Sequence, residues 1–158
     1  MKILLYIFLG LFFVGLALPN FISCGDRPKS TSVKSNMHTF QTIVETYSVD
    51  YPGLYAKNVE NLNKASKTAS NKYWKDFNNP YTGKTGKGIS YDNFDKNIIL
   101  DEQGWYNYFF PKKYPAGMVY YDPVIDGKNI TKYYIYGSYA NGKLIRDSNG
   151  MLLTLSNN

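Results

Sequence analysis

The feature that most constrains this chain is an uninterrupted apolar run close to its first residue. No charged residue occurs between Ile3 and Ile22, and Lys2 precedes the run. A helix of this length would span about 30 Å, at ~1.5 Å per residue, which matches the hydrocarbon thickness of a bilayer. The run also exceeds the ~7–15 apolar residues of a secretory signal peptide. We therefore expect residues 1–22 to form a membrane anchor, with these side chains in the apolar phase: Ile3, Leu4, Leu5, Ile7, Phe8, Leu11, Phe12, Val14, Leu16, Leu18 and Pro19.

The rest of the chain, residues 23–158, has the composition of one globular head. The 158 residues include 16 tyrosines, 9 phenylalanines and 2 tryptophans, which can bury large areas while keeping polar tips. Cys24 is the only cysteine, so neither an intrachain disulfide nor a cysteine-based metal cluster can form within the chain. Burial and backbone pairing must therefore hold the head together.

The net charge of +6 does not by itself indicate a nucleic-acid partner. Many of the lysines are scattered between Lys57 and Lys87 among Asn, Ser, Thr and Gly, and no arginine-rich run or RNA-binding signature occurs. We interpret these lysines as a solvated surface, and we expect no specific nucleic acid to bind.

A single amphipathic helix is predicted for residues 23–51. Its apolar residues recur at spacings of three and four, and Pro52-Gly53 ends the pattern because proline cannot continue a helix. Such a stripe is typical of packing on a sheet. The residues expected at this helix–sheet contact are Val33, Met37, Phe40, Val44 and Tyr47.

The remaining segments predict an α+β fold. Residues 52–116 read as a variable loop region, with a short helix at 59–69 and short strands at 89–94 and 97–100. Residues 117–158 are rich in strand formers and predict an antiparallel sheet of three or four strands. Expected strands are 117–122, 132–139, 143–146 and 151–155, with turns at Asp126-Gly127, at Asn149-Gly150 and, as a type I′ turn, at Asn141-Gly142.

The residues offer little support for catalysis or for a bound cofactor. The single histidine, His38, is expected on the surface of the helix, and no Gly-x-Ser-x-Gly, His-Glu-x-x-His or Walker motif occurs. Residues 83–88 read as a solvated turn. Residues 92–97 place several oxygen ligands close together, but the central glycine of a calcium loop is missing and Gln103 stands in place of its final glutamate. We expect no enzyme activity, no cofactor and no metal ligands.

Three stretches carry a resemblance to a known family. Ala17-Leu18-Pro19-Asn20-Phe21, the helix sequence 34–47 and Asn79-Pro80-Tyr81-Thr82-Gly83 resemble type IV pilins and the major (G-type) pseudopilins of type II secretion. The resemblance implies a non-enzymatic structural subunit that assembles with other pilin or pseudopilin subunits. It further implies a single pass through the bacterial inner membrane, with the head outside the cytoplasm. The family's C-terminal calcium loop is not expected here, because residues 141–147 carry two cations and one carboxylate.

The chain departs from this family at its start. The family is cleaved before Phe-Thr-Leu-Ile-Glu, and an alignment on Pro19 puts Lys2 where that glutamate should be. Three explanations stay open: a start codon further upstream, an anchor that is not processed, or lipidation of Cys24, since residues 21–25 loosely resemble a lipobox. The last gives the alternative function, a cell-envelope lipoprotein that acts as a binding module. The cations after the run weakly favour a cytoplasmic head, so the opposite orientation rests on the resemblance.

Overall fold

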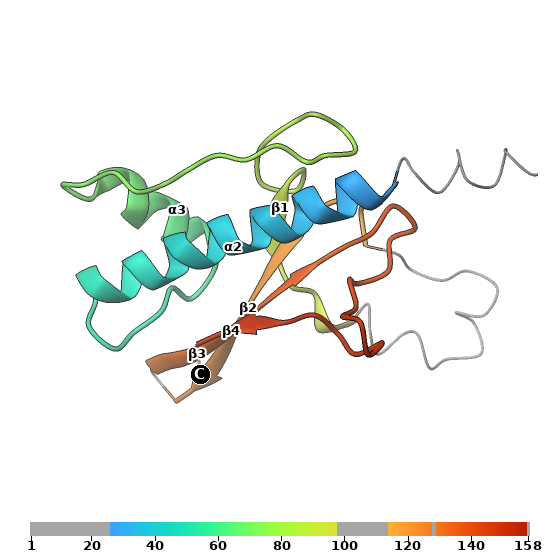
Figure 1. Cartoon of the computed structure of the whole chain (residues 1–158). Helices are drawn as coiled ribbons and strands as arrows, with labels where there is room; N and C mark the ends of the chain where they lie inside the picture. Colours follow the sequence, from blue (N-terminus) through green and yellow to red (C-terminus); the bar gives the residue numbers. More distant parts are fainter. Residues whose placement is uncertain (1–25, 98–113, 128, 158) are drawn as a thin grey trace, which may run out of the picture.

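The structure is a computed structural model that describes residues 26–97, 114–127 and 129–157. Two helices and four strands follow one another as α2 (Asp26–Asp50), α3 (Val59–Thr68), β1 (Tyr91–Asn93), β2 (Val119–Asp126), β3 (Asn129–Gly137) and β4 (Leu155–Ser156). In Figure 1 the long helix α2 lies across the sheet, and it packs on β2, β3, β4 and α3. The predicted α+β class is therefore confirmed for the described residues.

The predicted anchor, residues 1–22, and Cys24 lie outside the described residues. Within the residues that the structure does describe, no helix combines the length and the apolar character needed to cross a bilayer.

Helix α2 buries one stripe of side chains against the sheet. Val33, Met37, Phe40 and Val44 are each 0% exposed, while Tyr47 is half-buried at the edge of the same core. These residues fall on one face because a helix brings positions three and four apart together. The helix ends at Asp50, as Pro52 requires, and Gly53 adopts a positive φ of 77° in the turn that follows.

The core between α2 and the sheet is aromatic. The Phe40 ring lies 6.0 Å from the ring of Tyr121 and 6.2 Å from that of Phe77, between ring centroids. Tyr121 on β2 is paired with Ile135 on β3, so that both point to the helix side of the sheet. The opposite side carries a second, smaller apolar cluster around Tyr120. The sheet is therefore covered by apolar contacts on both faces over its central strands.

The sheet is mixed: the strands within residues 117–158 pair antiparallel, as predicted, and β1 adds a parallel strand that the predicted sheet did not include. The strand order is β1-β2-β3-β4, and the pairs β2–β3 and β3–β4 are antiparallel. Strand β1 runs parallel to β2, with Tyr91 opposite Val119. A parallel neighbour needs a long connection, and the chain between β1 and β2 supplies it. A strand of three residues is too short to show the alternation of buried and exposed side chains, so its pairing with β2 could not be predicted from the sequence.

The turn at Asn141-Gly142 also differs from the prediction. Of these two residues only Gly142 has a positive φ, of 74°, whereas a type I′ turn needs positive values at both. The Gly142 amide donates to the Tyr139 carbonyl (3.0 Å) and the Tyr139 amide to the Lys143 carbonyl (2.8 Å). These bonds close a three-residue loop whose last residue is the left-handed glycine.

The strands expected after residue 142 are shorter than predicted. Residues 143–146 and 151–155 make the isolated bridges Ser138↔Leu144 and Arg146↔Leu152, and only Leu155–Ser156 forms a strand. The expected strand at 97–100 lies largely outside the described residues.

Candidate functional site

The start of α2 is the part of the head that follows the predicted anchor most closely. None of the side chains at positions 27–32 is buried. The hydroxyl groups of Ser30 and Thr31 both donate to the Arg27 carbonyl at 3.0 Å, and Ser32 donates to the Pro28 carbonyl at 3.0 Å. These three hydroxyl groups therefore find their hydrogen-bond acceptors within the helix itself. The helix therefore begins as a polar, solvated rod and only then enters the core at Val33.

A hydrogen bond ties this half of α2 to the loop at residues 78–84, and an asparagine of that loop binds two further segments. The Asn36 side-chain amide donates to the Asn78 carbonyl at 2.9 Å. Next to it, the buried Asn79 donates to the carbonyls of Ile89 and Ala116, both at 2.7 Å, and accepts from the Tyr81 amide at 2.9 Å. One asparagine thus joins three segments of backbone. Residues 79–83, one of the three stretches that resemble pilins, are therefore a packed structural element of the head.

A carboxylate ties the other half of α2 to the sheet. Glu45 accepts hydrogen bonds from the hydroxyl groups of Tyr133 and Tyr55, the latter at 3.2 Å. Burial, and next its hydrogen bond to Glu45, raises the pKa of the Tyr133 hydroxyl above its ordinary value. Burial and then the nearby charge of Glu45 raise the pKa of Tyr55 in the same direction. Both hydroxyls therefore stay protonated donors, which makes this cluster a structural clamp.

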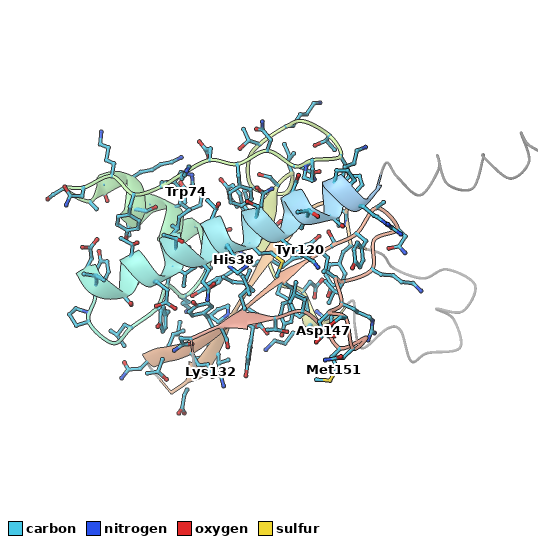
Figure 2. The ribbon with its side chains drawn as sticks, viewed as in Figure 1. His38, Trp74, Tyr120, Lys132, Asp147 and Met151 are labelled. Carbon is cyan, nitrogen blue, oxygen red and sulfur yellow. The ribbon has the colours of Figure 1, made fainter. Side chains whose placement is uncertain are left out.

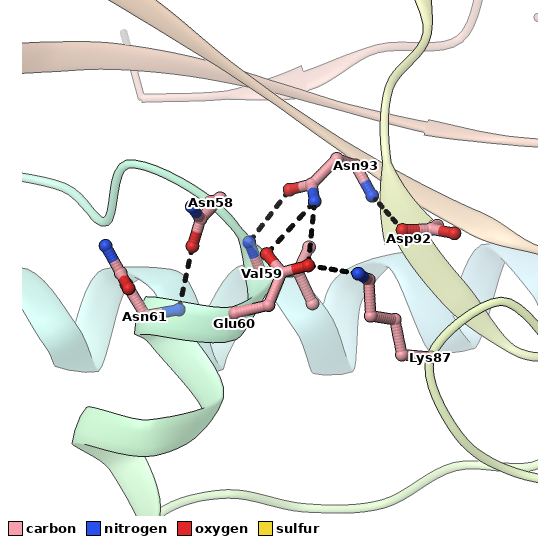
Figure 3. A network of polar contacts seen from close by, with 7 residues as sticks. All are labelled: Asn58, Val59, Glu60, Asn61, Lys87, Asp92 and Asn93. Atoms are coloured by element: carbon pink, nitrogen blue, oxygen red, sulfur yellow. Dashed lines mark hydrogen bonds and ion pairs between the residues drawn. The ribbon is translucent and has the colours of Figure 1, made fainter.

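Figure 3 shows a second polar network, which joins α3 to β1. The Asn58 side chain accepts from the Asn61 amide at 2.8 Å, and Asn93 accepts from the Val59 amide at 2.8 Å. Asparagine side chains thus accept hydrogen bonds from two of the backbone amides in the first turn of α3, as expected of helix caps.

The charged members of this network are Glu60 and Lys87. Their ion pair, together with a hydrogen bond from Asn93 (3.1 Å), lowers the pKa of the Glu60 carboxyl to about 2. All of these groups bind one another, so the network fastens two elements and leaves no free donor set for a ligand.

A hollow of about 160 Å³ lies where the calcium-like pattern was noted. Its lining includes Asp92, Asp95 and Tyr120. Both carboxylates are used by local turns, because Asp92 accepts from the Asn93 amide (2.8 Å) and Asp95 from the Asn97 amide (2.9 Å). In the described parts of the chain, no group of three or more His, Cys, Asp or Glu side chains is arranged to hold a metal ion. Gln103 lies outside the residues that the structure describes.

The structure places the remaining residues of interest in separate positions. His38 is exposed on α2, where Figure 2 labels it, and the clamp carboxylate of Glu45 lies further along the helix. Sequence reasoning missed the structural roles of Glu45, Asn79 and Asn93. Only Asn79 carried a signal, since the stretch 79–83 resembles the family.

Comparison with known proteins gives no relative for this chain: no family model, no curated protein and no solved structure matches it.

Proposed function

We propose that this chain is a membrane-anchored, pilin-like or pseudopilin-like structural subunit of a type II secretion or type IV pilus filament. One observation carries the proposal. Helix α2 begins four residues after the apolar run 3–22, buries none of the side chains 27–32, and then packs along the sheet from Val33 onward. This arrangement suits a rod that leaves a bilayer and carries a head.

The side of α2 that turns away from the sheet fits lateral contacts between subunits. Ser35, His38 and Thr42 are exposed and recur at spacings of three and four, which places them on one face. In the proposed assembly the apolar segments bundle in the inner membrane, and this polar face lies against neighbouring subunits. The role is structural and involves no catalysis.

Cysteine cross-linking in the membranes of cells that produce the full chain tests the assembly. The variant Cys24→Ser/His38→Cys should give disulfide-linked dimers on mild oxidation. The matched variant Cys24→Ser/Lys132→Cys places its cysteine at an exposed site on β3 and should give fewer. Monomers alone in the first variant, with the chain still in the membrane fraction, would contradict assembly.

The intact mass and N-terminal sequence of the same material separate this proposal from the lipoprotein alternative. A methylated terminus upstream of residue 1 supports a processed pilin, and an intact Met1 supports a retained signal anchor. A chain that starts at a lipidated Cys24 would overturn the filament proposal in favour of a lipoprotein.

A further inference from the structure

Two cations lie where α2 begins, and a third lies on the loop that contacts this half of the helix. Arg27 and Lys29 lie in the first turns of the helix, and Lys84 lies on the neighbouring loop. The Lys29 ammonium sits 5.1 Å from the centre of the Tyr81 ring, which joins the helix to that loop. We call Arg27, Lys29 and Lys84 the basic end.

The basic end is free to bind an anion. All three side chains are exposed. Within the described residues there are two ion pairs, Lys87–Glu60 and Lys96–Asp122, and neither includes a residue of the basic end. None of the three cations is therefore paired with a carboxylate whose side chain the structure describes, and cations outnumber carboxylates at this end even with Asp26, which precedes Arg27 in the sequence.

The far end of the head has a different charge pattern. Asp50 closes α2 and Asp126 closes β2, while Lys132 lies on the adjoining strand β3. The 25 residues of α2 separate its two ends by about 37 Å, at ~1.5 Å per residue. Charges of both signs thus occur at each end, but at the start of α2 the three cations outnumber Asp26, whereas at the far end Asp50 and Asp126 outnumber Lys132.

We propose that the basic end contacts the anionic phospholipid headgroups of the bilayer that holds residues 1–22. This inference rests on the proposed function, because it needs the anchor. Arg27 follows Ile22 by five positions, and a chain spans at most ~3.3–3.6 Å per residue, so the backbone of Arg27 stays within about 18 Å of the end of the apolar run. Clustered cations beside a membrane segment are attracted to anionic lipids, and a tyrosine ring such as Tyr81 suits the interface between lipid and water.

The test reconstitutes the full chain in vesicles of phosphatidylcholine alone or mixed with phosphatidylglycerol. A pulse of isotope-labelled acetic anhydride, a neutral reagent, then acetylates the lysines, and mass spectrometry gives the rate at each one. Lys29 and Lys84 should react about fivefold more slowly in the anionic vesicles, the factor that corresponds to the attraction of one cation. Added sodium chloride should remove the difference, because salt screens exposed charges.

Lys132 is the matched control. Like Lys29 it is exposed and lies over a tyrosine ring, with its ammonium 5.2 Å from the centre of Tyr134. Its rate should be equal in the two vesicles. The variant Arg27→Gln/Lys29→Gln should weaken the protection of Lys84, and Lys132→Gln should leave it unchanged.

The remaining outcomes distinguish a failure of the lipid contact from a failure of the membrane anchor. Equal rates at Lys29 and Lys84 in both vesicles, with the chain bound to both, would overturn the lipid contact and leave the anchor intact. A chain that floats with neither vesicle would overturn the anchor itself. Protection of the same lysines by duplex DNA without vesicles, but not by anionic lipid, would assign the basic end to nucleic acid.

Discussion

The α-carbon of Gly117 lies directly against the side chain of Asn79. A Cβ at position 117 would come 2.4 Å from Asn79 Oδ1 and 2.5 Å from Cδ2 of Tyr81, and Gly117 also has a positive φ of 76°. Because Asn79 holds the carbonyls of Ile89 and Ala116, this close approach fixes the loop before β2 on the loop beside α2. The contact explains why residues near 79 and 117 pack together although 38 positions separate them.

Replacing Gly117 by alanine should therefore destabilise the head strongly. The left-handed backbone costs about 1–2 kcal/mol for an L-residue, and the clash adds about 1–3 kcal/mol of overpacking. Urea unfolding should show a loss of about 3 kcal/mol. Gly53→Ala is the matched control, since Gly53 has nearly the same φ of 77° but nothing within 4 Å of an added Cβ. Equal losses in the two variants would refute the role of the close approach.

Phe40→Asp should prevent the head from folding. Phe40 is 0% exposed and is surrounded by other rings. Loss of such a ring costs about 3–5 kcal/mol, and an unpaired buried charge adds a further penalty, against a total stability of about 5–15 kcal/mol. Thermal unfolding followed by circular dichroism should show no cooperative transition. His38→Asp, two positions away and exposed, should keep the melting temperature; an unchanged Phe40→Asp would mean that the assignment of the helix face is wrong.

Glu60 should stabilise the head at neutral pH and lose this effect in acid. Its folded-state pKa of about 2 lies below its ordinary value of 4.5. A lowered pKa means that the stabilisation is fully present above pH 4.5 and disappears as the pH falls toward 2. Because the side chain is 45% exposed, water and salt screen the pair, and the effect at pH 7 should be only about 0.5 kcal/mol.

Urea unfolding of Glu60→Gln across this pH range measures the effect. The difference from the unaltered protein should shrink as the pH falls. Lys87→Gln removes the other partner and should remove most of the same pH dependence. A difference that grows in acid would contradict the sign.

Tyr121→Phe should remove a buried hydrogen bond between the sheet and the segment after α2. The Tyr121 hydroxyl donates to the Ala56 carbonyl at 2.8 Å, and the side chain is 0% exposed. The lost bond leaves a buried carbonyl without this donor, which should cost about 1–2 kcal/mol in urea unfolding. Tyr51→Phe, at an exposed position, should cost nothing measurable.

Alkaline pH should destabilise the head through its buried tyrosines. Burial raises the pKa of Tyr121 above its ordinary value of 10.0 and that of Tyr136 to about 12. In the unfolded chain these hydroxyls ionise near pH 10, so stability is complete below that pH and falls as the pH rises further. Tyrosinate absorbance should therefore rise in two steps, the later one together with unfolding. In Tyr121→Phe the later step should be smaller, and a single step near pH 10 would contradict the burial.

The sequence by itself predicted the elements whose residues carry their own pattern. The stripe from Val33 to Val44 follows from the helical period alone, because side chains three and four apart must share a face. The same holds for the turn after Asp126, which separates two runs of strand-forming residues. The α+β class follows from the order of these segments. The anchor, the filament and the orientation of the head remain proposals.

Only the tertiary structure decided how distant segments meet. Glu45 finds Tyr133 across 88 positions, Asn79 meets Ala116 across 37, and β1 lies parallel to β2. None of these contacts can be predicted from the spacing of neighbouring residues, because each one depends on how packing brings two distant segments of backbone together. Asn141-Gly142 makes the same point at short range, since the dipeptide suits both a two-residue and a three-residue loop. The hydrogen-bond register between Tyr139 and Lys143 selected the longer one.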